Sequence, residues 1–330
     1  MLPAATLRHR MDARRRSSRA ITCALAFVCL ALVVPAISSA AIKLTPVTGK
    51  LKTKIGIADQ KAEVFDDQRL RDLRFGYSRR SVAWDALRFA DQRAEIDAWV
   101  AGSRLMGADP LITLARSRKT NGPSYRPPTT TQYLREFLRF RQRYPDVKTW
   151  SAWNEANHCG VGTCKKPELV ARYYNAMRRN CPGCKVLAAD LLDQPNMVKW
   201  ARDFRRAARW EPKYWGLHDY IDANRFQTTR TASLLKAVRG EVWLTEIGGL
   251  VARRNGSQIK LQQGKAHAAR ATRFIFNRLA RLDRRVSRIY LYHWRSSTPR
   301  DSWDSALIGA DDKPRPALAV VKRLLGRPPN

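Results

Sequence analysis

Two glutamates, each near the end of a short apolar segment, are the residues of this chain whose type and spacing best suit catalysis. The segment TWSAWNEAN carries Asn154 and Glu155, and the segment EVWLTEIGG carries Glu246, 91 residues later. Cleavage of a glycosidic bond commonly needs two carboxyl groups on opposite sides of one sugar, one of them protonated and the other ionised. The pair therefore predicts this chemistry if the fold brings the two segments together.

The elements around the pair decide its meaning, because one glutamate at a strand end is more often part of a surface ion pair or a helix cap. Beyond residue 40 the chain alternates apolar runs of strand length with amphipathic runs of helix length, which is typical of a parallel sheet. Eight such βα units predict an α/β fold, a (β/α)8 TIM barrel in a single domain, rather than an open doubly wound sheet. The strand candidates are 54–59, 79–84, 110–115, 147–153, 185–190, 214–220, 241–246 and 288–294.

Capping signals place helices between these strands. Asp91 is one expected N-cap, Thr130 or Thr131 is another, and Pro167 suits a first helical turn. The segment 61–78 is heavily charged and contains a glycine, so it is the least regular of the expected crossovers.

The barrel hypothesis requires catalytic groups at the carboxyl ends of strands. Glu155, His218, Glu246 and Trp294 end the fourth, sixth, seventh and eighth strand candidates, so a closed ring would bring them to one cleft. Structural roles remain open for the two that are not acids. His218 could be a hydrogen-bonded core histidine, and Trp294 could fill the barrel as other large aromatics do.

With its motifs in this order, the chain resembles the clan A glycoside hydrolases. The resemblance covers most of the chain after residue 50 and rests on WNEAN, GLHDY, WLTEIGG and YHW arriving on the expected strands. It implies that Glu155 is the general acid/base, that Glu246 is the nucleophile, and that Asn154 bonds the 2-hydroxyl of the attacked sugar. It further implies that His218 lies near the nucleophile and that Trp294 forms an aromatic floor beneath the same sugar.

The resemblance also implies an arginine on the second strand that keeps the nucleophile ionised. Arg79 and Arg80 are adjacent, so the register of this arginine stays open. Three more residues at strand ends or in the following loops are expected substrate contacts: Asp59, Trp84 and Tyr220. Trp84 could equally belong to the core.

The two glutamates need different environments to play different roles. Arginine and histidine neighbours would favour the ionised form of Glu246, whereas an apolar setting against Trp153 would raise the pKa of Glu155. This division of roles predicts a retaining double displacement. The chemistry needs neither a metal nor an organic cofactor.

The first forty residues have the pattern of an export signal. Six arginines and Asp12 precede or open the apolar run 20–34, and small residues up to Ala40 offer a cleavage site. The run is shorter than the ~20 apolar residues of a membrane span, and Pro35 ends it. We expect a secreted protein with a mature domain over 41–330 and no membrane span; an uncleaved anchor is the alternative.

Four cysteines lie in the expected mature chain, at Cys159, Cys164, Cys181 and Cys184. Export favours disulfides, and two local bridges, Cys159 with Cys164 and Cys181 with Cys184, are the expected pairing among three possible ones. A zinc site with His158 beside the four thiols is the alternative.

The net charge of the chain is +34, and removing residues 1–40 leaves +29. Such a charge could hold the protein on an anionic cell wall, an acidic polysaccharide or a nucleic acid. Arginine outnumbers lysine 45 to 17 and is scattered along the helical segments, which favours a solvated surface over a specific polyanion site. We expect association with an anionic wall and no specific nucleic-acid partner.

The expected substrate is a polysaccharide or oligosaccharide. A basic cleft would suit chains that contain uronic acids, and a neutral cleft with exposed tryptophans would suit wall glucans, mannans or xylans. Two other hypotheses remain. A non-catalytic carbohydrate- or wall-binding barrel would keep its binding after replacement of both glutamates, and a basic wall- or nucleic-acid-binding protein would lose its binding in salt.

Overall fold

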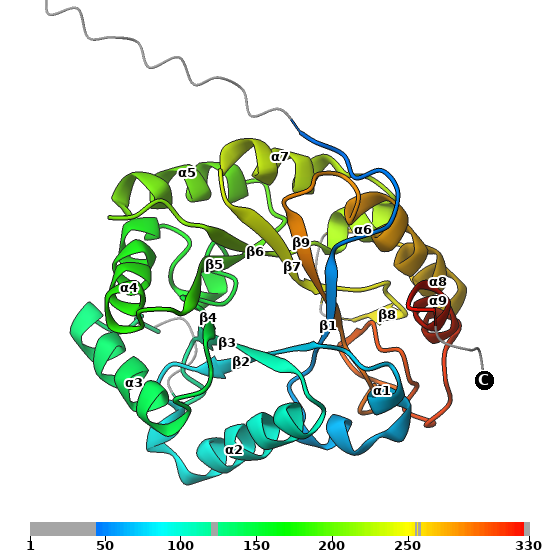
Figure 1. The fold of residues 1–330 in the computed structure, drawn as a ribbon, viewed down its shortest axis with the longest axis horizontal. Coiled ribbons are helices and arrows are strands. Elements are labelled where there is room, and N and C mark those ends of the chain that lie inside the picture. Colours follow the sequence, from blue (N-terminus) through cyan, green and yellow to red (C-terminus); the bar gives the residue numbers. More distant parts are fainter. Residues whose placement is uncertain (1–43, 120–124, 255, 257–258, 327–330) are drawn as a thin grey trace, which may run out of the picture. The chain divides into compact units, whose positions relative to one another are not determined.

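The structure, a computed structural model, describes residues 44–119, 125–254, 256 and 259–326 (Figure 1). The chain divides into the units 1–40 and 41–330, and all described elements belong to the second. The expected export signal lies outside the described residues.

Eight parallel strands close into a barrel around which the helices form a ring (Figure 1). Each of the eight predicted strand segments forms a barrel strand, so the predicted fold class is confirmed. Helices cover the outside and side chains fill the inside, which is why these strands are almost continuously apolar. The barrel strands are β1 (Lys54–Ala58), β2 (Tyr77–Ala83), β3 (Asp109–Ala115), β4 (Thr149–Ser151), β5 (Lys185–Leu192), β6 (Tyr214–His218), β7 (Glu241–Ile247) and β9 (Val286–Tyr292).

The helices follow the strands in the expected alternation. The first crossover is irregular, as its sequence predicts: it holds a 3-10 turn, Ala62–Asp66, and the five-residue α1. The helices are α1 (Gln68–Asp72), α2 (Ala90–Leu105), α3 (Thr130–Arg143), α4 (Pro167–Asn180), α5 (Met197–Ala207), α6 (Tyr220–Arg225), α7 (Thr229–Ala237), α8 (Lys265–Phe274) and α9 (Pro316–Leu324).

Two of the three expected helix starts differ from the structure by one or two residues. Asp91 lies in the first turn of α2, whose N-cap is Phe89. Thr129 caps α3 through a reciprocal capping box with Gln132, one residue before the expected threonines. Pro167 opens α4 as predicted.

The barrel interior changes from apolar to polar along the strands. A small buried cluster that includes Leu111, Leu187 and Trp243 fills one part of it. Further toward the carboxyl ends of the same strands, Leu111 is followed by Thr113 and Leu187 by Asp190, both of them buried. Polar side chains therefore occupy the interior on the side where the βα loops begin.

Two loops at the carboxyl ends of the strands form a second, two-stranded sheet. β8 (Ala252–Arg253) follows β7, β10 (Trp303–Asp304) follows β9, and the two pair antiparallel with Arg253 opposite Trp303. Each strand has only two residues, so neither carries a sequence signal of its own.

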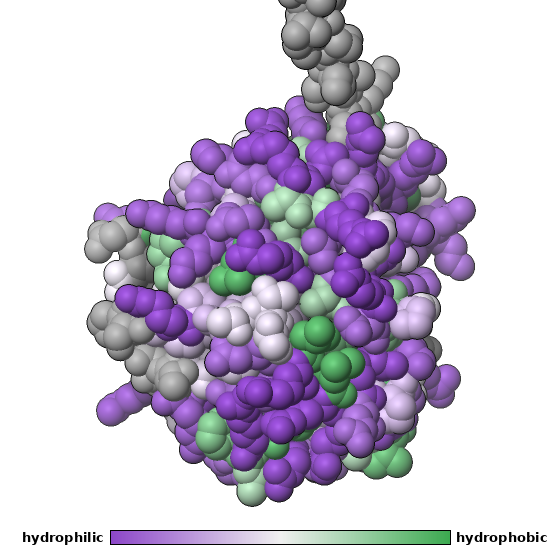
Figure 2. Space-filling model, turned by 90° about the vertical axis from the view of Figure 1, so that its left-hand side faces the viewer, coloured by the Kyte–Doolittle hydropathy of each residue, from purple (hydrophilic) through white to green (hydrophobic). Residues whose placement is uncertain are grey.

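The outer surface is hydrophilic with a few small apolar patches, as Figure 2 shows for the side that carries α3 and α4. Several arginines on it pair with nearby acids, such as Arg143 with Asp97 and Arg205 with Glu211. Among the described residues, no helix combines the length and the apolar character that crossing a membrane requires.

Candidate active site

Closure of the barrel brings Glu155, His218 and Glu246 together. Glu155 lies in the loop just after β4, His218 ends β6, and Glu246 lies near the end of β7. One carboxylate oxygen from each glutamate and one ring nitrogen of His218 all lie within 4.8 Å of one another. The separation of 91 positions in sequence thus does not separate the two glutamates in space.

Both glutamates open into a cleft of about 610 Å³. Their side chains are 29% and 14% exposed for Glu155 and Glu246, so water or a sugar can reach each carboxylate. The lining residues are Glu155, His158, Leu192, Asp193, Gln194, Tyr220, Ile221, Glu246, Arg253, Ile259, Leu261, Tyr292 and Trp303.

Arg79, on β2, is the arginine that reaches the nucleophile candidate. Its Nη1 donates to Glu246 Oε2 at 2.9 Å, and its Nη2 donates to Asn154 Oδ1 at 2.7 Å. Successive residues of a strand point to opposite faces, so Arg80 points out of the barrel, where it bonds Glu95 of α2 at 2.9 Å. Arg80 is therefore not part of the site.

A buried aspartate on β5 holds Arg79 in place. Asp190 Oδ2 accepts from Arg79 Nη2 at 2.6 Å and from Thr113 Oγ1 at 2.9 Å, and Oδ1 accepts from Ser151 Oγ at 3.0 Å. Burial by itself raises the pKa of Asp190, but Arg79 and His218 outweigh it and hold this pKa well below its usual value. Asp190 was not among the predicted site residues, although it ends the segment KVLAAD, because its contacts come from three other strands.

The position opposite Asp190 on β6 must be a glycine. A Cβ added at Gly216 would lie 2.0 Å from Asp190 Oδ1 and 2.8 Å from Thr245 Oγ1. The bare backbone of Gly216 therefore leaves the room that the aspartate occupies.

His218 lies close to both glutamates of the site. Its Nδ1 lies 3.2 Å from Glu155 Oε1 and 3.8 Å from Glu246 Oε2. Burial lowers its pKa, but the charge of Glu246 and the bonds to Asp190 and Glu155 outweigh burial and raise the pKa of His218 to about 9. Its Nε2 lies 3.0 Å from Nη2 of Arg79, which can only donate, so Nε2 accepts and Nδ1 carries the proton that His218 donates to Glu155.

The environment of Glu155 differs from the sequence prediction. Burial raises its pKa, but the bond and the charge of His218 outweigh burial, so the net pKa of Glu155 is lowered. The prediction of an apolar setting against Trp153 is wrong, because Trp153 is fully buried against the rings of Tyr133 and Tyr173, on α3 and α4.

Tyr220 contacts the second oxygen of Glu246. Its hydroxyl donates to Glu246 Oε1 at 3.1 Å, while Arg79 binds Oε2. The two donors fix the carboxylate plane, and Tyr220 also lines the cleft. The structure thus places Tyr220 where the sequence predicts a substrate contact.

The aromatic residue at the end of β9 that lines the cleft is Tyr292, not Trp294. β9 ends at Tyr292, so the chain has left the strand before it reaches Trp294. Trp294 has no exposed surface, and its Nε1 donates to Asp67 Oδ2 at 2.9 Å. The structure therefore does not place Trp294 as a floor beneath a sugar.

Asp59 and Trp84 also lie outside the cleft lining. Asp59 is buried and accepts from the backbone N of Lys61 and Trp294, at 3.0 and 2.8 Å. Trp84 is 8% exposed and packs under the guanidinium of Arg88. Both contribute to packing and loop anchoring.

Two cleft residues, Arg253 and Trp303, were absent from the sequence prediction. The small β8–β10 sheet brings them to the cleft from loops that start on different barrel strands. The ring of Trp303 meets Tyr220 edge to face at 4.4 Å. A tryptophan in a long loop gives no sequence signal of this position, since only the tertiary pairing creates it.

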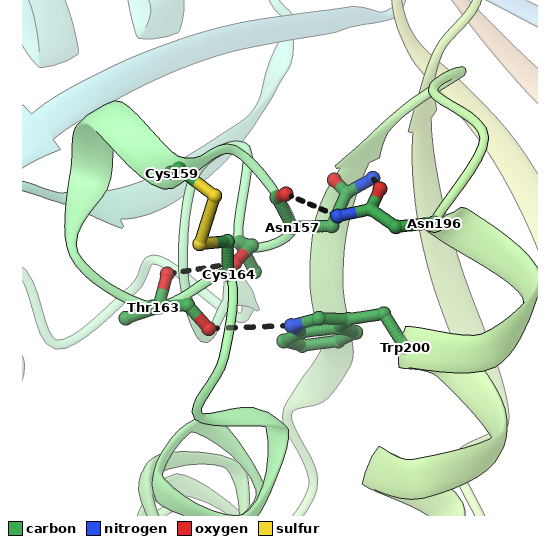
Figure 3. Close-up of a disulfide and its surroundings, with 7 residues drawn as sticks. Asn157, Cys159, Thr163, Cys164, Asn196 and Trp200 are labelled. Atoms are coloured by element: carbon green, nitrogen blue, oxygen red, sulfur yellow. Dashed lines mark hydrogen bonds between the residues drawn. A yellow bond between two sulfur atoms is a disulfide. The ribbon is translucent and has the colours of Figure 1, made fainter.

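The loop that carries Glu155 is tied down on its far side (Figure 3). A disulfide joins Cys159 to Cys164, Thr163 Oγ1 donates to the carbonyl of Ala156 at 2.7 Å, and Trp200 Nε1 donates to the carbonyl of Thr163 at 3.3 Å. These contacts fix a loop in which Glu155 itself has a left-handed backbone, with φ of 50°.

The second disulfide joins Cys181 to Cys184, between α4 and β5. Both predicted pairings are therefore present, and the four cysteines are not arranged as thiolate ligands of zinc.

Within the described part of the chain, Glu155, His218 and Glu246 form the group whose spacing could hold a metal ion. Arg79 already places a positive charge 2.9 Å from Glu246 Oε2, which opposes a bound cation. The expectation of a metal-free site stays a prediction.

No protein-family model and no curated protein sequence matches the chain. Solved structures do match. A family 39 glycoside hydrolase from Bacteroides cellulosilyticus WH2 is 14% identical, with a TM-score of 0.55, over 82% of this chain and 63% of that one. Xylanase 10B from Thermotoga maritima is 13% identical, with a TM-score of 0.57, over 84% of this chain and 95% of that one.

An endo-β-1,3-glucanase of family GH128 from Amycolatopsis mediterranei is 14% identical, with a TM-score of 0.51, over 82% of this chain and 98% of that one. The chain shares the (β/α)8 barrel fold of these glycoside hydrolases. At these identities the likeness establishes the fold, and the activity must be argued from the site. The chain spans less than two thirds of the family 39 enzyme.

Proposed function

We propose that this protein is a secreted glycoside hydrolase that cleaves O-glycosidic bonds of a polysaccharide or oligosaccharide with retention of configuration. The observation that carries the proposal is the approach of Glu155 and Glu246 to within 4.8 Å in one cleft. Retaining enzymes hold their carboxyls about 5 to 5.5 Å apart, whereas inverting enzymes leave about 6.5 to 9.5 Å for a water. The matched xylanase and glucanase support a polysaccharide substrate.

Glu246 is suited to attack the anomeric carbon. Its two oxygens are held by different donors, Arg79 on Oε2 and Tyr220 on Oε1. The guanidinium of Arg79 places a positive charge 2.9 Å from the carboxylate oxygen Oε2. The hydroxyl of Tyr220 sets the orientation of the carboxylate, so less motion is needed to reach the sugar.

Glu155 is suited to general acid/base work through its pairing with His218. Nδ1 of His218 donates to Glu155 Oε1 at 3.2 Å, and this hydrogen bond holds the carboxylate at the edge of the cleft. In the first step Glu155, as the general acid, gives a proton to the leaving oxygen and becomes a carboxylate. In the second step Glu155 takes the proton of the attacking water.

Asn154 is suited to bind the 2-hydroxyl of the sugar under attack. Arg79 is a pure donor and fixes Oδ1 of Asn154, so the amide NH₂ is turned to the other side. A bond from this amide that strengthens in the transition state would stabilise it selectively.

Secretion and wall association are part of the proposal. The export pattern of residues 1–40 and the two disulfides support an oxidising compartment. The charge of +29 on residues 41–330 supports attraction to an anionic wall.

The test is a screen of the purified protein against a polysaccharide panel, with Glu155→Ala as the blank. We expect one polysaccharide to be cleaved, with NMR showing product of the original anomeric configuration. Glu246→Ala should abolish turnover, and azide should restore a product of inverted configuration. Activity retained in Glu246→Ala would refute the assignment, and binding without turnover would favour the non-catalytic carbohydrate-binding barrel.

A further inference from the structure

We propose that the cleft wall formed by β8 and β10 is a subsite for a uronic acid, in which Arg253 binds the sugar carboxylate and Trp303 packs on the sugar ring. This inference rests on the proposed function, because it assumes that the cleft takes a saccharide, and it adds the substrate class.

The register of the small sheet places the two residues side by side. Arg253 pairs with Trp303 across the antiparallel ladder, and the guanidinium carbon lies 5.3 Å from the centre of the indole ring. Residues directly opposite in such a ladder project to the same face. Both line the cleft, so the shared face is the one that a ligand meets.

The guanidinium of Arg253 is held in position. Its Nη1 donates to the carbonyl of Ile259 at 2.8 Å, and its backbone N donates to Gln263 Oε1 at 2.6 Å. With the indole on one side, these contacts restrict the planar fork before any ligand arrives. A carboxylate is the ligand group whose two oxygens match that fork.

A chain of aromatic rings connects Arg253 to the nucleophile. Tyr220 bonds Glu246 through its hydroxyl and meets Trp303 edge to face at 4.4 Å, and Trp303 in turn carries Arg253. The subsite therefore belongs to the side of the cleft on which the sugar attacked by Glu246 is held. Tyr292 adds a second aromatic surface to the same cleft.

The charges of the cleft suit an incoming carboxylate. Arg79 pairs with Glu246 at 2.9 Å, and His218 contacts Glu155 at 3.2 Å. Groups of the protein therefore already offset the negative charges of the two glutamates. Asp193 is the other acid of the lining, and Arg253 interacts with it electrostatically. Arg253 is only partly buried, so its guanidinium is a cation that an anionic ligand in the cleft can reach.

The experiment measures binding without turnover, in a Glu155→Gln, Glu246→Gln background. The probes are oligosaccharides of polygalacturonate, alginate and hyaluronan, each compared by calorimetry with its carboxyl-reduced counterpart, in which the carboxylate is a CH₂OH group. We expect at least one uronate oligosaccharide to bind about tenfold more tightly than its reduced form. Arg253→Met should remove that preference and leave binding of the reduced form unchanged.

The matched control is Arg254→Met, which removes the same charge from the next residue. Arg254 is exposed, does not line the cleft, and donates to the carbonyl of Asp301. It should keep the preference for the uronate. Arg253→Lys keeps the charge but lacks the planar fork, so it should lose part of the preference for the uronate over its reduced form. This second variant keeps the test valid if Arg253→Met does not fold.

Two outcomes would overturn the inference: a cleft that binds no uronate oligosaccharide more tightly than its reduced form, or equal losses in Arg253→Met and Arg254→Met. If uronate binding depends on Arg253 but the unaltered protein cleaves nothing, the proposed function fails and the subsite stands.

Discussion

Arg79 links the two halves of the site's chemistry. Its buried guanidinium contacts Glu246 in the cleft and Asp190 in the barrel interior. Burying a cation without partners costs a large free energy, so Arg79 needs its acidic partners to remain in the barrel interior. Arg79, which orients Glu246, is thus itself held in place by Asp190.

The first prediction concerns Asp190. Asp190→Asn should lower kcat strongly and lower the free energy of unfolding by about 3 to 5 kcal/mol, because it leaves part of a buried charge uncompensated. The measurements are turnover and denaturant unfolding. Asp146→Asn is the control, since Asp146 pairs with Arg104 at the exposed surface and its loss should cost about 0 to 1 kcal/mol.

If Asp190 only fills space, the asparagine, which has the same shape, will leave the pH dependence of turnover unchanged. If Asp190 positions Arg79 and charges His218, the alkaline limb of the pH profile will move to lower pH. An unchanged limb with reduced stability would contradict the positioning role.

The second prediction concerns the pH dependence of stability. The pKa of His218 is raised from 6.5 to about 9 in the folded protein. A raised pKa stabilises the fold fully below the unfolded value, and this contribution is lost as the pH rises through the folded value. Between about pH 6.5 and 9 the protein should lose a few kcal/mol that it gained from the His218 proton.

The measurement is urea unfolding at several pH values for the unaltered protein and for His218→Gln. The variant should be less stable at pH 6 and should show a flatter dependence across this range. Parallel curves for the two proteins would show that His218 does not carry the effect.

At the scale of single elements, the alternation of apolar and amphipathic segments was enough to predict the eight barrel strands. Parallel strands buried on both faces are rich in apolar residues, so most of them can be recognised without knowledge of their neighbours, although β2 carries Arg79 and Arg80. Helix starts were less certain, because Thr129, Thr130 and Thr131 are all able to cap and only the bond to Gln132 decides between them. The side-chain direction of Arg79 and Arg80 needed the register of β2.

Strand ends and loops limited what could be predicted of the site. Tyr292 and Trp294 are two residues apart, and only the last residue of β9 decides which of them faces the cleft. Arg253 and Trp303 meet through a sheet of two-residue strands, which no periodicity can reveal. The sequence thus predicted Glu155, Glu246, His218 and Tyr220, which lie at or just after strand ends. It missed Asp190 inside β5 and the loop residues Arg253 and Trp303.

The third prediction concerns the loop that carries Glu155. Replacing Cys159 and Cys164 by serine should cost only about 2 kcal/mol of unfolding free energy, because the bridge closes a short loop. Turnover should fall more than stability does, since the bridge helps to hold Glu155 against His218. The other disulfide, Cys181–Cys184, lies outside the cleft lining and closes a loop of similar length.

The double serine variant of Cys181 and Cys184 is therefore the matched control. We expect it to lose a similar amount of stability and to keep its kcat. Equal effects of the two double variants on kcat would show that the first disulfide has no special role in placing Glu155.

At the scale of the whole molecule, the excess of arginine raises the question of what the charge does. Some surface arginines pair with nearby acids, as Arg143 does with Asp97, but +29 on residues 41–330 cannot be balanced within the protein. Long-range attraction by such a surface does not depend on the cleft, whereas recognition of a uronate by Arg253 does. The two effects differ in their response to salt and to mutation.

The fourth prediction separates attraction by the surface charge from recognition of a uronate by the cleft. Co-sedimentation with an anionic cell-wall preparation should fall by at least tenfold as salt rises from about 50 to about 200 mM, because attraction between opposite charges at the surface is screened. The Glu155→Gln, Glu246→Gln double variant and Arg253→Met should sediment as the unaltered protein does. A wall stripped of its anionic polymers should bind none of the three proteins. Cleavage of a short neutral oligosaccharide should not change over the same range of salt. Wall binding that resists salt but fails in Arg253→Met would mean that the protein holds the wall through its cleft, and the surface charge would then need another explanation.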